Sequence, residues 1–417
     1  MRYNLAICVV LAIFSTQAAA AAPGAEMPPE TRALHESLIT LDAHLDTPAS
    51  LDRPDWQITD EHDVHRDHSQ VDLPRMENGG LDGGFWAIYT PQGPLDTAHY
   101  QKARDFAIMR GLSIREMVAA DPAHFALATQ TKDAAAIAAD SKRIVYMSIE
   151  NAYPLGEDVS LITLFHDMGV RLVGFAHFAN NQFADSSTDP KGEQWGGLSP
   201  LGKDLLAEMN RLGIVADASH SSDAVLDDIL ELSTSPIILS HSGCKAIYDH
   251  PRNVDDDRLR ALAAKGGVIQ INSFGSYLRE TEKNPERMKA LGALFGSRGD
   301  GKMTRESYKE FLDRWNEIDR LYPAEDVPDF DDFMAHLLHA LKVVGPDHVG
   351  IGLDWDGGGG VVGMEDVAAL PRITDALLKA GYTRQDLEKI WSGNTLRVLR
   401  AAGTHAELGH VRLNGAD

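Results

Sequence analysis

The chain has 417 residues, of which 43% are hydrophobic and 24% charged, and 62 acidic against 39 basic residues give a net charge of -23 at pH 7. A chain this acidic repels phosphate backbones and anionic lipid, so the composition excludes an ordinary nucleic-acid-binding protein and favours a small-molecule partner. Glycine and proline are spread along the chain rather than gathered in one tract, which is typical of a globular protein.

The first residues have the pattern of a targeting segment. Arg2 precedes an apolar run over residues 5–14, and alanines follow at residues 18–22. The run is too short to span a bilayer, which takes about 20 apolar residues. This arrangement predicts a secretory signal peptide over residues 1–20, whose removal leaves an exported protein, periplasmic or secreted, without a membrane anchor.

Short apolar runs rich in Val and Ile recur along the rest of the chain, and segments with helical spacing follow them. Alternation of this kind predicts an α/β fold in which helices cover a parallel sheet. Eight such units indicate a TIM-type (β/α)8 barrel, which we expect to form one catalytic domain over residues 21–417. The eight runs are residues 38–41, 83–88, 144–149, 172–175, 214–216, 237–239, 267–271 and 348–353.

Two of the predicted helices carry clear end signals. Residues 201–212 are followed by Gly213, a residue that often ends a helix. Residues 222–232 begin at Ser221 or Ser222, either of which can cap the first turn.

Two longer segments interrupt the repeating pattern. The gap from Phe274 to Pro346 holds charged helical patches such as residues 305–318, which predicts a helical insertion before the last strand. Residues 51–75 show no periodicity, and we expect them to cross the barrel mouth as an irregular segment.

Acidic residues and histidines follow most of the predicted strands. A parallel strand that is buried on both faces should read as hydrophobic, so repeated polar residues at its carboxyl end need a chemical reason. Because all carboxyl ends open at one mouth of the barrel, these side chains should converge there. The residues are His44, Asp46, Glu150, His177, His220, His241 and Asp354.

Each of these residues alone has an ordinary structural explanation. Glu150 could cap the following helix, Asp354 could form a turn, and a single histidine at a strand end is more often a packed rim residue than a ligand. Their joint placement at one mouth favours a metal centre. Imidazole and carboxylate without thiolate suit zinc, with manganese, cobalt or iron as substitutes, so Cys244 is not needed as a ligand.

The order of motifs resembles the membrane dipeptidase (renal dipeptidase) family of zinc peptidases, a branch of the amidohydrolase-type barrels. The resemblance covers most of the mature chain and lies nearest the bacterial exported members, since the lipid-anchor tail and the disulfide cysteines of animal relatives are missing. Its most specific segments are LDAHLDTP at residues 41–48, MNRLGIVADASH at 209–220, SHS at 240–242, DHPRNV at 249–254 and DHVGIGLDWDG at 347–357.

The resemblance implies a centre with two zinc ions. His44, Asp46 and Glu150 would hold one ion, and Glu150, His220 and His241 the other, so that Glu150 bridges them. Two ions about 3.5 to 4 Å apart can share a hydroxide and polarise the scissile carbonyl. The implied function is a zinc-dependent dipeptidase that cleaves a peptide bond with the metal-bound hydroxide.

The resemblance also implies roles for three further residues. His177 would contact the substrate carbonyl and stabilise the oxyanion, and Arg252 would bind the free C-terminal carboxylate. Asp354 would accept and donate protons beside the hydroxide. Each role suits its side chain, because a guanidinium matches a carboxylate and an acid near the metals can carry a proton. Glu150, His177 and Asp354 are thus the expected catalytic residues.

Some predictions from the sequence remain open. Leu45 stands between His44 and Asp46 where family members often have Asn, and Phe178 follows His177 where Asn is more usual, which leaves the substrate preference undecided. Related barrels act on other amide or lactam bonds, and a metal-bearing binding protein without turnover is a further alternative. Family members are commonly homodimers, so the resemblance implies a homodimer here as well.

Overall fold

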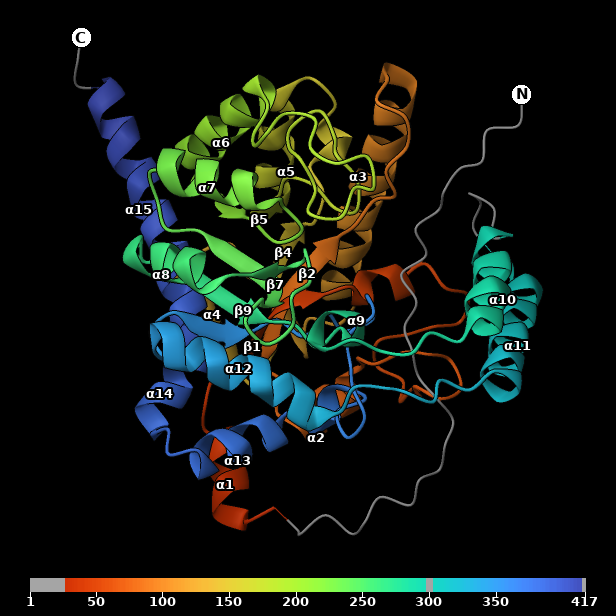
Figure 1. The fold of residues 1–417 in the computed structure, drawn as a ribbon. Helices are drawn as coiled ribbons and strands as arrows, with labels where there is room; N and C mark the ends of the chain where they lie inside the picture. Colours follow the sequence, from red (N-terminus) through yellow and green to blue (C-terminus); the bar gives the residue numbers. More distant parts are fainter. Residues whose placement is uncertain (1–26, 298–302, 415–417) are drawn as a thin grey trace.

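The computed structural model describes residues 27–297 and 303–414 (Figure 1). The predicted signal peptide lies outside these residues. Within the described ranges, no helix combines the length and the apolar character that crossing a membrane requires.

Eight parallel strands form the centre of the molecule, in the hydrogen-bonded order β1-β2-β4-β5-β6-β7-β9-β10. Two shorter strands lie off this path, since β3 pairs with β4 and β8 pairs with β7. The strands are β1 (Leu41–Leu45), β2 (Gly83–Ile88), β3 (Phe125–Leu127), β4 (Arg143–Ile149), β5 (Val170–Gly174), β6 (Val215–Asp217), β7 (Ile238–Cys244), β8 (Asn253–Val254), β9 (Val268–Ile271) and β10 (Val349–Ile351).

The sheet curves until its last strand meets its first. Just beyond β10, Trp355 bridges to Leu45 of β1, and its carbonyl accepts a hydrogen bond of 2.8 Å from the backbone N–H of Asp46. This contact almost closes the barrel and confirms the predicted TIM-type (β/α)8 fold. Another weak seam lies between β6 and β7, where the ladder holds the single pair Asp217 and Ile238.

Helices surround this barrel (Figure 1). The α-helices are α1 (Pro29–Glu36), α2 (Leu73–Gly79), α3 (Thr97–Ala120), α4 (Thr131–Ala139), α5 (Ile162–Met168), α6 (Pro200–Leu212), α7 (Asp223–Leu232), α8 (Asp256–Ala264), α9 (Gly275–Leu278), α10 (Pro285–Gly296), α11 (Arg305–Leu321), α12 (Phe330–Val344), α13 (Pro371–Lys379), α14 (Arg384–Glu388) and α15 (Asn394–Asn414). Short helical turns of other types are η1 (Thr47–Ser50), η2 (Tyr153–Leu155), η3 (Val159–Leu161), η4 (Val367–Ala369) and η5 (Lys389–Gly393).

The end signals of α6 and α7 act as the sequence predicts. Gly213 ends α6 with a left-handed φ of 74°, which a glycine adopts without steric cost. The side chain of Ser222 caps α7 by accepting a hydrogen bond from the backbone N–H of Val225, so Ser222 and not Ser221 is the cap.

The helical insertion before the last strand is confirmed and comprises α9 to α12. Helices α10 and α11 stand to one side of the barrel (Figure 1). They lie against the irregular segment at residues 51–75, because Arg305 forms an ion pair with Asp55 and the ring of His68 stacks on Trp315 with 3.8 Å between centroids. The insertion is thus anchored to a segment about 250 residues earlier in the chain.

The irregular segment also reaches the carboxyl end of the barrel. The backbone N–H of Gln70 donates to Asp356, which follows β10, over 2.7 Å, and the Gln70 side chain accepts from the backbone N–H of Asp356 over the same distance. This pair of hydrogen bonds places the segment beside the mouth, as the sequence predicts.

The first strand lies further along the chain than predicted. Its expected position is residues 38–41, whereas β1 spans Leu41–Leu45. Asp42 and His44 therefore lie inside the strand, with their polar groups buried and hydrogen-bonded instead of following its end.

Candidate metal centre

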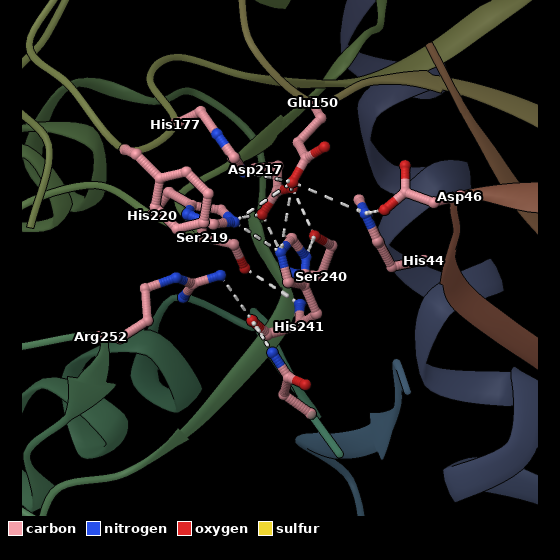
Figure 2. A network of polar contacts seen from close by, with 12 residues as sticks. His44, Asp46, Glu150, His177, Asp217, Ser219, His220, Ser240, His241 and Arg252 are labelled. Carbon is pink, nitrogen blue, oxygen red and sulfur yellow. Dashed lines mark hydrogen bonds and ion pairs between the residues drawn. The ribbon is translucent and has the colours of Figure 1, made fainter. Parts of the chain in front are cut away.

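The residues singled out in the sequence lie close together at the carboxyl end of the barrel, where Asp354 joins His44 and Asp46 in one group. Figure 2 shows the others: His44, Asp46, Glu150, His177, His220 and His241. Most of them stand directly after a strand, where the chain leaves the sheet and the side chain can turn into the mouth. His44 lies in β1 and His241 in β7, while Asp46, Glu150, His177, His220 and Asp354 follow β1, β4, β5, β6 and β10.

Glu150 lies at the middle of this cluster. Its Oε1 atom faces the Nε2 atoms of four histidines, at 3.7 Å from His44, 3.3 Å from His177, 3.2 Å from His220 and 3.7 Å from His241. All five side chains are buried, so little water can separate them. One carboxylate oxygen surrounded by four imidazole nitrogens is the arrangement expected around divalent cations.

An acidic part of the cluster lies on the other side of His44. Its Nε2 atom is 3.3 Å from Oδ2 of Asp46, and ligand atoms of His44, Asp46 and Asp354 all lie within 4.8 Å of one another. Gly357 makes this approach possible, because a Cβ atom there would overlap the carboxylate oxygens of Asp46 and Asp354.

The ligand atoms can be grouped in more than one way. Besides the acidic group, His44 and Glu150 form a possible site with His241, and Glu150 forms another with His177 and His220. His177, which the sequence analysis assigns to the substrate, thus lies as near to Glu150 as the expected metal ligands do.

Burial and mutual charge set the protonation of the histidines. Burial lowers the pKa of His220 and His241 well below the usual range, which leaves them neutral and able to offer a lone pair. Burial also disfavours a charge on His44, but the carboxylates of Asp46 and Glu150 outweigh it and raise the pKa of His44 to about 10.

The carboxyl groups respond in opposite directions. Burial raises the pKa of Asp354 and of Asp46, and the charge of Glu150 raises both further. Burial acts likewise on Glu150, but His177 and His44 outweigh it and hold its pKa well below the usual range. Buried acids crowded together fit divalent cations, whose charge offsets the repulsion between the acids.

Backbone strain coincides with the cluster. His220, Asp354 and Asp356 have φ values of 65°, 65° and 64°, in the left-handed region that residues other than glycine seldom adopt. Each of these residues follows a strand of the barrel. The tight turns direct the side chains of His220 and Asp354 into the mouth instead of along the sheet.

Arg252 approaches the cluster from the segment after β7. It is buried and donates to the carbonyl of His241 over 2.9 Å and to the hydroxyl of Ser242 over 3.1 Å. Its Nε–H has no hydrogen-bond partner among the described residues, and its guanidinium lies 5.5 Å from the ring centroid of Tyr277. Arg252 can therefore offer a free donor to an anionic group.

The polar residues behind the histidines carry no predicted role from the sequence. Asp217, Ser219 and Ser240 form a buried hydrogen-bonded network around His241 (Figure 2). The only sequence signal was their place beside His220 and His241 within the two motifs.

Cys244 lies at the end of β7, apart from the candidate ligand groups. It is absent from the ligand groups, and its thiol, buried beside α12, donates to the carbonyl of His336 over 3.5 Å. Burial raises the pKa of this thiol to about 12, so it stays protonated at neutral pH.

A model of the membrane dipeptidase family, peptidase family M19, matches residues 29–411. The chain belongs to this family. Dipeptidase tcpJ of Claviceps purpurea is 33% identical to it over 353 residues, which cover 83% of this chain and 72% of the relative. Dipeptidase aclJ of Aspergillus oryzae is 28% identical over 338 residues, with coverage of 80% and 70%.

Solved structures of membrane dipeptidase relatives share the fold. The probable dipeptidase PvdM of Pseudomonas aeruginosa superposes with a TM-score of 0.76 at 30% identity, covering 90% of this chain and 98% of that one. A metallopeptidase of Rhodobacter sphaeroides, liganded with a phosphinate mimic of the dipeptide L-Ala-D-Ala, gives 0.69 at 25% identity, with coverage of 88% and 99%. The predicted family is confirmed, and this member is a metallopeptidase that acts on dipeptides.

Proposed function

We propose that this dipeptidase uses two zinc ions, with Glu150 between them. His44 and Asp46 would complete the binding of one ion, and His220 and His241 that of the other. The observation that supports this arrangement is the position of Glu150 Oε1, which faces Nε2 of His44 at 3.7 Å and the Nε2 atoms of His220 and His241 at 3.2 and 3.7 Å. A carboxylate reached from both sides suits a ligand shared by two ions.

The bound ions would supply a Lewis acid for the scissile carbonyl and a nucleophilic hydroxide at neutral pH. The chain's own groups would do the remaining work. His177, whose Nε2 atom is 3.3 Å from Oε1 of Glu150, would donate to the carbonyl oxygen as negative charge develops on it. Asp354, whose pKa burial raises well above the usual range, would hold a proton and pass it to the leaving amine.

Arg252 would determine the length of the substrate. Its guanidinium, with the free Nε–H, would bind the C-terminal carboxylate of the dipeptide. If that carboxylate is fixed while the scissile carbonyl lies over the metals, a single residue fits between them. The relative liganded with a mimic of L-Ala-D-Ala supports a substrate of this size.

A panel of dipeptides with L-L and L-D configuration tests the proposal. We expect cleavage that stops when a chelator is added and returns with zinc, and elemental analysis should find about two zinc ions per chain. His220→Ala and His241→Ala should each lower the zinc content. Full zinc content in both variants would contradict the ligand assignment, and no chelator-sensitive cleavage of any dipeptide would contradict the function.

Arg252 can be tested separately from the metals. Arg252→Ala should lower kcat/KM for a free dipeptide by about a hundred-fold or more, because a buried charge-assisted contact is lost. The C-terminal amide of the same dipeptide should lose much less. An equal loss on both substrates would instead favour a hydrolase of other amide or lactam bonds.

We also infer that residues 21–417 form one catalytic domain, exported after loss of residues 1–20, and that the protein is a homodimer. The pattern at residues 5–22 and the family resemblance support these inferences. Mass spectrometry of the protein from its native host tests the loss of residues 1–20. Light scattering in solution tests the homodimer. An intact Met1 or a monomeric mass would contradict them.

A further inference from the structure

A buried carboxylate lies behind the candidate ligand His241. Asp217, at the end of β6, is 3% exposed. Its Oδ1 atom accepts hydrogen bonds of 2.9 Å from the backbone N–H groups of Ser219 and Ser240, and its Oδ2 atom accepts one of 2.5 Å from the Ser240 hydroxyl. Three donors thus converge on one carboxylate.

The direction of these hydrogen bonds determines where the protons lie. A serine hydroxyl has one proton, and Ser240 directs it to Asp217, because a carboxylate can only accept. The Ser240 oxygen also lies 2.7 Å from Nδ1 of His241. With its own proton committed, this oxygen must accept, so Nδ1 of His241 is the donor.

This donor role selects one form of the imidazole ring. A neutral histidine carries one ring proton, so a proton on Nδ1 leaves the lone pair on Nε2. The Nε2 atom of His241 is 2.8 Å from Nε2 of His220 and 3.7 Å from Oε1 of Glu150, inside the candidate metal centre. The lone pair is therefore presented on the side where an ion would be bound.

His220 lacks such support. Its Nδ1 atom is buried and has no hydrogen-bond partner among the described residues. Two candidate ligands of the same ion are thus held in different ways, and only the ring of His241 is fixed by a chain of hydrogen bonds.

We propose that Asp217 is a positioning residue for metal binding, which acts through Ser240 to hold His241 in the form that offers Nε2 to the ion. The Asp217–Ser240–His241 relay rests on the metal centre proposed above. It assigns to Asp217 an effect on the affinity for zinc that goes beyond its backbone contacts.

Asp217→Asn and Ser240→Ala test the relay, alone and together. An Asn side chain at position 217 can donate to Ser240, which would then turn its proton toward His241 and leave the ring proton on Nε2. An Asp-to-Asn change behind the histidine of a serine-protease triad has this effect. Each variant should weaken zinc binding by about 10- to 100-fold, the usual cost of losing such a partner.

The double variant separates a relay from two independent effects. Both single changes break the same chain of hydrogen bonds. The zinc affinity of the double variant, Asp217→Asn with Ser240→Ala, should therefore be no lower than that of the single variant with the lower affinity. Zinc affinity is measured by competition with a chromophoric chelator on the metal-free protein. Losses that multiply, or wild-type affinity in Ser240→Ala, would overturn the proposal.

Two further variants serve as controls. Ser240→Thr keeps the hydroxyl and should stay within a few-fold of wild-type affinity. Ser148→Ala removes a buried hydroxyl of β4 that has no hydrogen-bond partner among the described residues, so it should bind zinc like the wild type. If Asp217→Asn does not fold, the contrast between Ser240→Ala and Ser240→Thr still decides the question.

A spectroscopic measurement tests the relay independently of zinc. In metal-free protein with 15N-labelled histidine, the His241 signals, assigned by their loss in His241→Ala, should show the proton on Nδ1 in the wild type and on Nε2 in Asp217→Asn. The same tautomer in both proteins would overturn the relay. A wild-type protein that takes up no zinc would contradict the proposed function, and the tautomer measurement would still decide the relay.

Discussion

The two weak seams of the barrel are joined in the same way but with different results. Between β6 and β7, Asp217 accepts from the backbone N–H groups of Ser219 and Ser240 where the ladder holds one pair. Between β10 and β1, Asp42 accepts from the backbone N–H groups of His44 over 2.9 Å and of Leu353 over 3.1 Å. In both places a buried carboxylate replaces missing ladder hydrogen bonds.

The difference between the seams lies in what else the carboxylate contacts. Asp217 also accepts from a hydroxyl that reaches a candidate ligand ring, whereas the hydrogen bonds given above for Asp42 come from backbone N–H groups. We therefore expect Asp217 to affect metal binding and Asp42 to affect mainly the stability of the fold. A buried acid near a metal centre need not affect metal binding.

The largest expected effect comes from the loop that follows the β10–β1 seam. Gly357→Ala would place a Cβ atom against the carboxylates of Asp46 and Asp354 and push both out of position. Because a misplacement of about 1 Å can cost a hundred-fold for one group, we expect kcat/KM to fall by about a thousand-fold or more. Steady-state kinetics and zinc content measure the loss, and near wild-type values of both would show that the loop adapts.

Removing the carboxylate of Asp42 should weaken the fold. Asp42→Ala leaves the backbone N–H groups of His44 and Leu353 without an acceptor, at roughly 4 kcal/mol of unfolding free energy in total. Urea unfolding of the metal-free protein measures it, and Asp42→Asn, which keeps an acceptor oxygen, should lose less. A large loss of zinc affinity at unchanged stability would erase the contrast with Asp217.

Acid should lower the free energy of unfolding through His35, which is buried in α1. Burial lowers the pKa of His35 to about 4 from its usual 6.5. The unfolded chain takes up this proton as the pH falls below 6.5 and the folded chain does not, so His35 contributes its full stability above pH 6.5 and loses it between pH 6.5 and 4. The loss is roughly 3 kcal/mol.

Unfolding of the metal-free protein at several pH values measures this effect. His35→Gln should reduce the pH dependence between pH 6.5 and 4. An unchanged slope in His35→Gln would contradict the prediction.

The smallest effect serves as the control for Gly357. Gly292 lies exposed in α10 of the insertion, and a Cβ atom there would meet nothing within 4 Å. Gly292→Ala should leave kcat/KM unchanged and stabilise the protein by up to about 1 kcal/mol, since alanine favours a helix. Lower activity would show that the insertion communicates with the barrel mouth.

Most of the barrel could be predicted because its strands are buried on both faces and read as continuous apolar runs. The first strand was misplaced by three residues because Asp42 and His44 interrupt its apolar pattern, although their polar groups are satisfied inside the fold. Strands β3 and β8 were not predicted, since two or three residues leave no periodic signal.

The candidate site could be predicted in outline from the placement of polar residues after strands. Its supporting contacts could not, because they join residues that are distant in the chain. Asp42 meets Leu353, and His68 stacks on Trp315, across separations at which no local pattern carries information. Asp217 and Ser240 are visible in the motifs, but the direction of their hydrogen bonds needs the structure.

The buried thiol of Cys244 provides a natural reporter on the strand that carries His241. It is the single free cysteine among the described residues, fully enclosed at the end of β7. A thiol reagent can modify it only while β7 is open, so the labelling rate in native buffer measures how often this strand separates from its neighbours. A slower rate on adding zinc would measure, without any substrate, how firmly the ion holds the barrel together.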